Sequence, residues 1–236
     1  MKFSLCIPMY NESKIIAETA KTLSCFMAKN FDDYEIIFSD DGSLDGSGEI
    51  VEGLSLPNVR VVGYKENRGK GAAVRTAVLE SMGDIVMFTD SDLAYGTSVI
   101  TAVADEFLKR PDCDVVVGSR NIAGDGYDGY TFVRKIASKS YIAFLKVLGG
   151  LKISDSQCGC KAFRGDAARK IFALCEVDRF AFDFEAILVA EKFGYKISEI
   201  PVKVINHGDS KVHVLRDAVR MVRDILAIKK RIRKIK

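Results

Sequence analysis

Residues 84–95 read DIVMFTDSDLAY, an apolar segment typical of a buried parallel strand, and it runs directly into Asp90 and Asp92. Two carboxylates at the end of such a strand supply hard oxygen ligands, which suit a divalent cation and a polyphosphate. In an extended segment, residues two apart project to the same side, so we expect Asp90 and Asp92 to face one ion while Ser91 points away. A solvated acidic turn gives the same short pattern by chance, so the interpretation depends on the rest of the chain.

Strand and helix patterns alternate on both sides of this segment. Apolar runs and amphipathic stretches predict strands at 3–9, 34–40, 58–64, 84–90 and 113–119, with helices at 12–29, 45–54, 70–82 and 97–109. Repeated β-α units with short connections predict an α/β fold, in which a mostly parallel, Rossmann-like sheet carries helices on both faces. The second half is less regular, and its expected elements are a helix at 131–148, a polar strip at 154–163, a helix from residue 166 and a strand at 197–205.

The composition is that of a globular protein expected to stay in the cytoplasm. The chain has 236 residues, 48% of them hydrophobic and only four of them Pro, which is enough for one sizeable core. No N-terminal stretch has the layout of a signal peptide, and no apolar run approaches the roughly 18 to 20 residues that span a bilayer. The six cysteines are interpreted as reduced packing residues, because CGC at 158–160 has no second pair for zinc. A redox role for Cys158 and Cys160 is the minor alternative.

Polar clusters follow five of the predicted strands. They are PMYNE (8–12), SDDGSLDGS (39–47), ENRGKG (66–71), TDSD (89–92) and GSR (118–120). Ligands in sheets of this kind bind beyond the carboxyl ends of the strands, so the clusters are expected to share one edge and one site. This common position favours a functional role for Asp90 and Asp92 over a chance turn.

Two of these clusters suit a nucleotide. The glycines of ENRGKG lie between a strand and a helix, where backbone amides approach a phosphate, and Arg68 and Lys70 can neutralise it or touch a ribose. A solvated basic turn is the alternative, because the spacing matches neither a dinucleotide fingerprint nor a Walker loop. Asp40 and Asp41 can accept hydrogen bonds from a base or a ribose, while a helix N-cap is the alternative for one aspartate.

The motifs PMYNE, SDDGSLDGS, NRGKGAA and TDSD, in this order, resemble the nucleotide-sugar-binding half of the family 2 glycosyltransferases, which have the type A glycosyltransferase (GT-A) fold. The resemblance implies that Asp90 and Asp92 bind Mg²⁺ or Mn²⁺ together with the diphosphate of the donor. It assigns the nucleoside to five residues of the first two motifs: Pro8, Tyr10, Glu12, Asp40 and Asp41. Arg68, Lys70 and Ser91 complete the expected donor site.

The second half resembles the polyprenyl-phosphate sugar transferases in the segments GSR, VRKIAS, DSQCGCKAF, FAFDFEAILVAEKFGYKISEIPV and GDSKV. The nearest group is the dolichyl-phosphate β-glucosyltransferases, with the dolichyl-phosphate mannose synthases as cousins. The resemblance implies that Arg120, Arg134 and Ser138 bind the lipid phosphate and that Ser210-Lys211 lies by the donor diphosphate. Arg134 and Ser138 are four residues apart on a predicted helix, so they share a face on which a guanidinium and a hydroxyl can grip a phosphate.

The predicted reaction is the inverting transfer of a hexose from a nucleoside diphosphate sugar to a polyprenyl phosphate at the cytoplasmic face of a membrane. A phosphate monoester is largely dianionic at neutral pH and attacks without a general base. Asp92, Arg120 and Arg134 are therefore the predicted catalytic residues, which position the anions and screen their repulsion. UDP-glucose is the favoured donor and GDP-mannose the alternative, because Ala94 stands where mannose synthases carry an acidic or amide residue. The same departure leaves the third metal ligand unassigned.

Two alternatives stay open. A family 2 glycosyltransferase that acts on a sugar hydroxyl of a polysaccharide or glycolipid needs a carboxylate base, for which Asp183 and Glu185 are the candidates. A helix-start charge at Asp183 and a structural pairing at Glu185 are the competing interpretations, and we favour these. A nonenzymatic nucleotide-binding module that docks on membranes is the other alternative, which keeps Asp40 and Asp41 but has no need for a lipid-phosphate site.

The basic charge of the chain is concentrated at its C-terminal end. Residues 211–236 carry ten Lys or Arg and two Asp, a net charge of +8, which leaves −5 for the other 210 residues of a chain with a net charge of +3. We therefore expect a catalytic domain at 1–210 and a basic amphipathic helix at 211–236. Within the domain, 1–120 is the expected nucleotide-sugar half and 121–210 the acceptor half.

At helical spacing, this C-terminal segment has one apolar face and an opposite basic face. Such a helix is typical of a peripheral protein attracted to an anionic membrane surface. A helix docked on the domain that ends in a solvated basic tail is one alternative, and an oligomer contact is another. Nucleic acid is disfavoured as a partner, because the segment has no aromatic residue for base stacking.

Overall fold

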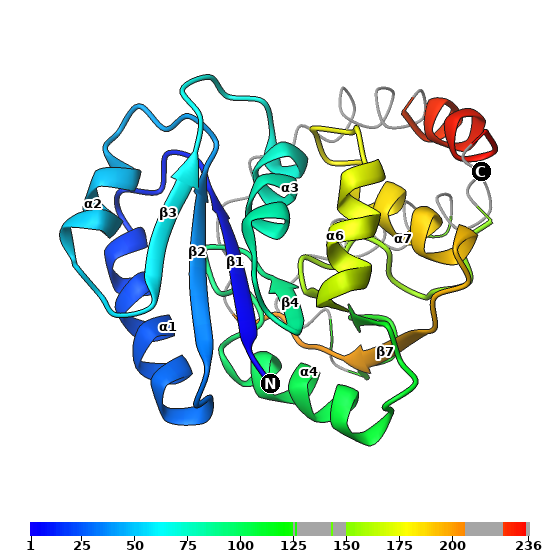
Figure 1. Ribbon diagram of the computed structural model, residues 1–236, viewed down its shortest axis with the longest axis horizontal. Coiled ribbons are helices and arrows are strands. Elements are labelled where there is room, and N and C mark those ends of the chain that lie inside the picture. Colours follow the sequence, from blue (N-terminus) through cyan, green and yellow to red (C-terminus); the bar gives the residue numbers. More distant parts are fainter. Residues whose placement is uncertain (125, 127–142, 144–149, 206–223, 235–236) are drawn as a thin grey trace.

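The structure, a computed structural model, describes residues 1–124, 126, 143, 150–205 and 224–234 of the chain. A seven-stranded sheet crosses it in the order β3-β2-β1-β4-β6-β5-β7 (Figure 1). The strands are β1 (Phe3–Met9), β2 (Tyr34–Asp40), β3 (Val59–Gly63), β4 (Ile85–Phe88), β5 (Val115–Ser119), β6 (Lys161–Arg164) and β7 (Ile197–Pro201). Every pairing is parallel except the two made by β6, which runs antiparallel to β4 and β5. The prediction of an α/β fold with a mostly parallel sheet is confirmed.

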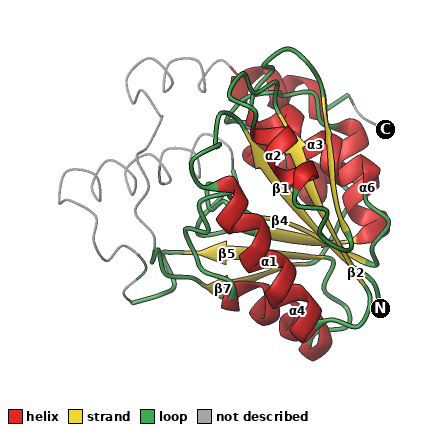
Figure 2. Ribbon diagram, turned by 90° about the vertical axis from the view of Figure 1, so that its left-hand side faces the viewer, coloured by secondary structure: helices red, strands yellow, loops and turns green. Residues whose placement is uncertain are grey.

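Helices cover both faces of the sheet, because its central strands are apolar on both sides. The helices are α1 (Ile16–Asn30), α2 (Ser47–Gly53), α3 (Lys70–Glu80), α4 (Ser98–Lys109), α6 (Gly165–Leu174) and α7 (Phe182–Lys192). One core lies between the sheet and α1, α2 and α4, and a second lies between the sheet and α3, α6 and α7. In the turned view, α1 and α6 accordingly lie on opposite sides of β1 and β2 (Figure 2).

Most elements lie where the sequence predicts them, and β6 is the exception. Each strand and helix predicted before residue 121 is present, with ends that shift by a few residues. β6 lies inside the strip that was expected to be polar and irregular. Its four residues are too few to show a period, and its first residue, Lys161, is a charged residue at a fully buried position. The helix predicted at 131–148 falls almost wholly outside the described residues.

The strand order reverses between β1 and β4, which places a crevice at the carboxyl ends of these two strands. β2 and β3 lie on one side of β1, and β4 continues the sheet on the other side. In open α/β sheets, such a switch point is where ligands bind. Because β6 is antiparallel, its first residue and the preceding segment 154–160 lie at this same edge. The clusters that follow β1, β2, β4 and β5 therefore meet residues that precede β6.

The end of the C-terminal segment is docked on the domain. Residues 224–232 are helical, and Ile225, Ile228 and Ile232 are buried in the core that contains α3, α6 and α7. The predicted apolar face is present, but over these residues it contacts protein, which corrects its interpretation as a membrane-facing surface. The side chains that stay exposed are Leu226, Ala227, Lys230, Arg233 and Lys234. Residues 211–223 lie outside the described part of the chain.

Among the residues that the structure describes, none of the helices is both long enough and apolar enough to cross a membrane.

Candidate active site

Asp90 and Asp92 lie in a turn at the switch point, immediately after β4. The backbone N–H of Leu93 donates to the carbonyl of Asp90 over 3.1 Å, and that of Ala94 donates to Asp92 Oδ1 over 3.0 Å. The two aspartates are therefore not held in an extended strand, as the sequence suggested, but the turn still brings their charges together. Burial, followed by the negative charges of Asp90 and Glu12, raises the pKa of the Asp92 carboxyl, although Lys70 and the Ala94 N–H act in the opposite direction.

Lys70, the first residue of α3, forms an ion pair with Asp90. Burial acts to lower the pKa of Lys70, but Asp90, Asp183 and Asp92 outweigh it and raise this pKa. The ammonium thus pairs with Asp90 and is also influenced by the negative charges of Asp183 and Asp92. The phosphate or ribose contact expected of Lys70 stays a prediction, but the ion pair places Lys70 beside the expected metal ligands.

The Asp90 and Asp92 carboxylates suit a divalent cation that shares its coordination with a substrate. Among the described residues, no group of three or more His, Cys, Asp or Glu side chains is placed to hold a metal by itself. Mg²⁺ is commonly bound by one or two carboxylates together with substrate phosphates, so two hard oxygen donors fit such an ion. A Cβ atom on Gly159 would overlap Asp90 Oδ2, so glycine at this position leaves room for the carboxylate.

Asp41 fixes the turn that leads into α3. Its buried carboxylate accepts hydrogen bonds from four donors: the Tyr64 hydroxyl at 2.7 Å, Asn67 Nδ2 at 2.8 Å, the Arg68 N–H at 2.9 Å and the Gly69 N–H at 2.9 Å. These bonds engage both carboxylate oxygens. Asp41 therefore holds residues 67–69, and the direct nucleoside contact expected of it stays a prediction.

The same turn is held from the other side by residues 177–179. A Cβ on Gly69 would lie 2.5 Å from the carbonyl oxygen of Asp178, and Gly69 has a φ of +121°, so only glycine fits without strain. The Ala72 N–H donates to the same carbonyl over 3.1 Å. The Asp178 carboxylate pairs with Arg68 at 3.3 Å and with Arg75. Arg68 is thus directed to Asp178 in this structure.

The loops after β1 and β2 are joined by hydrogen bonds. The Asn11 N–H donates to Ser43 Oγ over 3.0 Å, the Glu12 N–H to Ser47 Oγ over 2.9 Å, and the Ser13 N–H to Asp45 Oδ2 over 2.9 Å. Burial acts to raise the pKa of Asp45, but the hydrogen bonds from Ser47 and Ser13 lower it to about 2. These contacts make the two loops one unit.

The remaining donor-site candidates lie on this unit or beside it. Pro8 pairs with Ser39 in the β1–β2 register, and Tyr10 and Glu12 follow β1 directly. Asp40 accepts from the Ser43 N–H over 2.8 Å. Ser91 is nearly buried, and its carbonyl accepts from the Thr19 hydroxyl over 2.8 Å. The structure therefore gathers the predicted donor residues at one edge, apart from Lys211, which lies outside the described residues.

A buried ion pair joins Lys161, the first residue of β6, to Asp183 in the first turn of α7. Lys161 Nζ lies 2.5 Å from Asp183 Oδ1 and donates to the Cys158 carbonyl over 2.6 Å. Burial raises the pKa of Asp183, although Lys161 and Lys70 act to lower it. Sequence reasoning gave Lys161 no role, because a single lysine in a four-residue strand carries no periodic signal. Its position in the DSQCGCKAF segment was the available cue.

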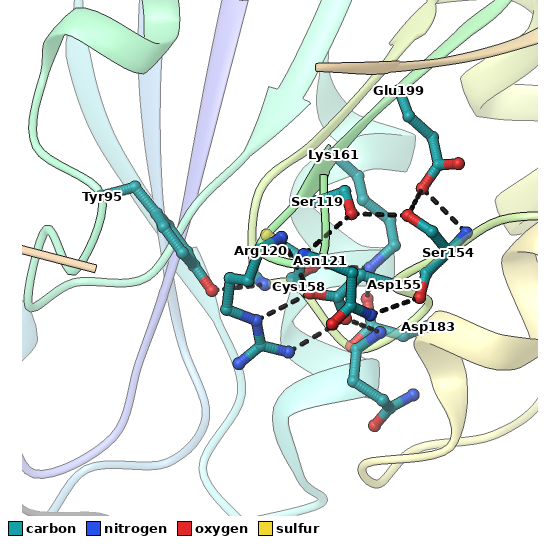
Figure 3. Close-up of polar contacts among 12 residues, drawn as sticks. Tyr95, Ser119, Arg120, Asn121, Ser154, Asp155, Cys158, Lys161, Asp183 and Glu199 are labelled. Atoms are coloured by element: carbon teal, nitrogen blue, oxygen red, sulfur yellow. Dashed lines mark hydrogen bonds and ion pairs between the residues drawn. The ribbon is translucent and has the colours of Figure 1, made fainter. Parts of the chain in front are cut away.

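Arg120 is held by Asp155, a second residue to which the sequence gave no role (Figure 3). Arg120 Nε and Nη2 donate to the two carboxylate oxygens of Asp155 over 2.7 and 2.9 Å, and Asp155 is fully buried. Burial acts to lower the pKa of Arg120, but Asp155 and Tyr95 raise it further above its usual value. The acceptor-phosphate role predicted for Arg120 therefore has to coexist with this bidentate pair. Arg134 and Ser138 lie outside the described residues.

The segment before β6 is fixed by further polar contacts. Ser119 Oγ and Ser154 Oγ lie 2.6 Å apart, and Ser154 Oγ donates to Glu199 Oε1 over 2.6 Å (Figure 3). The Gly159 N–H donates to the Tyr95 hydroxyl over 3.3 Å. This segment therefore has a defined path between β5, β7 and the turn after β4.

Glu185, the second candidate base, is a structural residue in this fold. Its fully buried carboxylate accepts the N–H groups of Glu176 at 3.0 Å and Val177 at 2.9 Å, and it pairs with Arg231 of the C-terminal helix. The structural interpretation of Glu185 is thus supported by its partners.

Five of the six cysteines are buried packing residues. All six are free, and only Cys25 is exposed. Burial, with Asp155 nearby, raises the pKa of Cys158 to about 11, although Arg120 and Lys161 lower it. A thiol with such a pKa is protonated at neutral pH, which disfavours a thiolate role in redox chemistry or metal binding.

The sequence was compared with known families and proteins. Residues 4–172 match glycosyl transferase family 2. The dolichyl-phosphate β-glucosyltransferase of Dictyostelium discoideum is 32% identical over 239 residues, which cover 96% of this chain and 73% of that protein. The enzyme of the same name from Saccharomyces cerevisiae is 27% identical, with 96% and 73% covered.

Solved structures share the fold. Glucosyl-3-phosphoglycerate synthase from Mycobacterium tuberculosis, crystallised with Mn²⁺, UDP-glucose and glycerol 3-phosphate, superposes with a TM-score of 0.70 at 19% identity and covers 100% of this chain and 81% of its own. Mannosyl-3-phosphoglycerate synthase from Rubrobacter xylanophilus gives a TM-score of 0.66 at 18% identity, with 98% and 73% covered. The expected GT-A fold is thereby confirmed. Taken with the family match over most of the sequence, the chain belongs to glycosyl transferase family 2 and is a glycosyltransferase.

Proposed function

We propose that the chain transfers glucose from UDP-glucose to a polyprenyl phosphate, with inversion at the anomeric carbon. The named relatives are dolichyl-phosphate β-glucosyltransferases, and the similarity extends over almost the whole chain, including the acceptor half. Ala94 stands two residues beyond Asp92, where mannose synthases carry an acidic or amide residue, which favours glucose over mannose.

The observation that carries the choice of acceptor is the pairing of Asp183 with Lys161. A sugar hydroxyl requires a carboxylate that can take its proton, and Asp183 is already bound to a buried ammonium at 2.5 Å. Glu185 is bound to backbone N–H groups and to Arg231. A phosphate monoester has no proton to give up at neutral pH, so it is the acceptor that these carboxylates suit. Transfer to a sugar hydroxyl is correspondingly disfavoured.

The donor is held in this proposal by residues at the switch point. Asp90 and Asp92 would bind Mg²⁺ or Mn²⁺, which supplies positive charge to the departing diphosphate. The N-terminus of α3 lies beside these aspartates, since Lys70 pairs with Asp90, and its positive dipole suits a diphosphate; Asp41 and residues 177–179 hold the turn that leads into it. Pro8, Tyr10, Glu12 and Asp40 would line the nucleoside side.

The acceptor phosphate is placed by Arg120, with Arg134 and Ser138 as proposed partners. Asp155 binds Arg120 through Nε and Nη2 and so fixes the orientation of the guanidinium that would meet the phosphate. A guanidinium locked in this way loses little conformational freedom when the anion arrives. Arg134→Ala should abolish transfer while leaving nucleotide binding nearly intact.

We also propose that the enzyme acts peripherally at the cytoplasmic face of a membrane. The supporting observation is the exposed side of the docked C-terminal helix, which presents Lys230, Arg233 and Lys234 beside Leu226. Basic side chains near an anionic surface each contribute roughly 1 kcal/mol. In this arrangement the basic face of the helix, not its buried apolar face, would meet the lipid.

A radiolabelled-sugar assay tests the proposal. UDP-glucose, UDP-galactose, UDP-N-acetylglucosamine and GDP-mannose are each incubated with the full chain, with and without polyprenyl phosphate and Mn²⁺. We expect lipid-linked label from UDP-glucose alone, and only when both the phosphate acceptor and the metal are present. Transfer to a sugar hydroxyl without polyprenyl phosphate would contradict the proposal, and the anomeric proton coupling of the product tests inversion.

A further inference from the structure

Lys70 lies where it would compete with a metal ion for Asp90, and where a diphosphate would compete with Asp90 for Lys70. Its ammonium forms an ion pair with Asp90, and its side chain is about one quarter exposed. It is the first residue of α3, so it stands at the helix end whose N–H groups suit a phosphate. The Lys70 side chain therefore lies beside both the proposed metal ligand Asp90 and the proposed position of the diphosphate.

Asp90 already has one cation beside it in this structure, the Lys70 ammonium. Asp90, Asp92 and Asp183 contribute three negative charges, and Lys70 and Lys161 contribute two positive ones. Lys161 is fully buried against Asp183, so it cannot move to the aspartates of the turn. Lys70 is the more accessible lysine of the cluster, because its long side chain is partly exposed. A divalent ion bound to Asp90 would repel an ammonium held on the same carboxylate.

Lys70 also has a second place to go without any movement of the backbone. The turn before it is fixed by Asp41 and by the carbonyl of Asp178, so only its side chain needs to rotate. A diphosphate at the N-terminus of α3 offers negative oxygens within reach of the same side chain. Arrival of the diphosphate can therefore draw the ammonium away from Asp90 and expose that carboxylate to the metal.

We propose that Lys70 is a tethered cation that occupies the metal's carboxylate in the unloaded enzyme and makes divalent-metal binding depend on the nucleoside diphosphate. This inference rests on the proposed donor site. Lys70 is a positioning residue in this role, since it acts by controlling access to Asp90. By thermodynamic linkage, the nucleotide strengthens metal binding by the same factor by which the metal strengthens nucleotide binding.

Mn²⁺ titration followed by electron paramagnetic resonance tests the proposal on the full chain. In the absence of nucleotide, Lys70→Met should bind Mn²⁺ at least tenfold more tightly than the unsubstituted chain. With UDP alone and no metal, the same variant should bind the nucleotide more weakly, as measured by calorimetry. The factor by which UDP strengthens Mn²⁺ binding, corrected for the complex that Mn²⁺ and UDP form in solution, should therefore fall in Lys70→Met.

Matched variants separate this role from a general change in charge. Lys65→Met removes one exposed lysine from the same loop and should leave Mn²⁺ affinity within about twofold, because exposed charges are largely screened. Lys70→Arg keeps a cation on Asp90 and should bind Mn²⁺ as weakly as the unsubstituted chain. Lys70→Gln provides a second neutral variant if Lys70→Met is unstable to heat.

Three outcomes would overturn the proposal: an unchanged nucleotide-free Mn²⁺ affinity in both neutral variants, an equal increase in Lys65→Met, or an unchanged coupling factor. Failure of the unsubstituted chain to bind UDP at all would instead contradict the proposed donor site. The nucleotide-free titration of Lys70→Met is independent of that result, so the two failures are distinguishable.

Discussion

Lys161 Nζ lies 2.5 Å from Asp183 Oδ1, and the lysine that makes this contact has no exposed surface. Removing one partner leaves the other charge buried without compensation, which typically costs about 3 to 5 kcal/mol. We expect Lys161→Met to lower the free energy of unfolding in urea by about 3 kcal/mol. The double variant Lys161→Met/Asp183→Leu should recover most of this loss, because it removes both charges. A double variant as unstable as the single one would show that the loss has another origin.

The same double variant tests whether Asp183 is a general base. General-base catalysis contributes about 10²–10⁴-fold to rate, so loss of a true base should be large. We expect transfer to polyprenyl phosphate to fall by less than about tenfold in Lys161→Met/Asp183→Leu, since a phosphate acceptor needs no base. A fall of several hundredfold with UDP binding unchanged would assign the proton transfer to Asp183.

Asp41→Asn should weaken the proposed donor site indirectly, through the turn at residues 67–69 that Asp41 holds. The amide replaces one carboxylate oxygen by an N–H₂ group, so in either orientation donors lose their acceptor: the Tyr64 hydroxyl and the Arg68 N–H at Oδ1, or Asn67 Nδ2 at Oδ2. Unsatisfied buried donors cost about 1 to 3 kcal/mol each, so we expect about 2 kcal/mol of lost stability together with weaker UDP binding. Thermal unfolding and calorimetry measure the two effects. Asp33→Asn, an exposed change just before β2, is the control and should alter neither.

Gly159→Ala should disturb Asp90, the proposed metal ligand, without unfolding the protein. The added methyl group would overlap Asp90 Oδ2, which is the end of a side chain that can rotate away. Small misplacements of reacting groups have large effects on rate, so we expect transfer to fall by about tenfold or more, with weaker Mn²⁺ binding in the presence of UDP. Gly53→Ala is the matched control, because a Cβ there meets nothing within 4 Å. Equal activity of the two variants would argue against Asp90 as the metal ligand.

Arg231→Met should make stability depend on pH through Glu185. Burial raises the pKa of Glu185, while the Val177 N–H and Arg231 lower it, so loss of Arg231 raises this pKa further. A raised carboxyl pKa favours the folded state when protonated, so stability is lost as pH rises from the unfolded pKa, about 4.3, toward the folded one. We expect a deficit of about 2 kcal/mol at pH 7, because the arginine is partly exposed, and a smaller deficit near pH 4. Lys230→Met, on the exposed side of the same helix, should show no such pH dependence.

The sequence predicts the first half of the fold well because each strand there has a local signal. Apolar runs such as YEIIFSD and DIVMFTD end in polar residues, and the carboxyl ends of parallel strands must share an edge. The strand order is not local information, so the reversal between β1 and β4, which creates the crevice, could not be predicted from spacing. β6 was missed for a related reason, since its direction and burial are set by its neighbours β4 and β5.

The site residues likewise divide into those with a local signal in the sequence and those whose partners are distant in the chain. Asp90 and Asp92 were predicted because two carboxylates follow an apolar strand. The partners of Asp41 and Arg120 were not, because they come from residues 23 to 35 positions away in the chain. The sequence predicts that the C-terminal helix is amphipathic, but it does not predict what the apolar face contacts. An apolar face suits a protein core as well as a lipid surface.

The docking of the C-terminal helix has a consequence for synthesis of the chain on the ribosome. Ile225, Ile228 and Ile232 complete the core that contains α3, α6 and α7, and Arg231 compensates the buried Glu185. A nascent chain that has emerged only as far as β7 therefore lacks three apolar side chains of this core and the guanidinium that pairs with Glu185. Apolar surface left exposed in this way promotes aggregation and chaperone binding. Maturation of the enzyme thus waits for residues near the end of the chain, and a translational pause before residue 225 would prolong the interval in which the nascent chain is vulnerable.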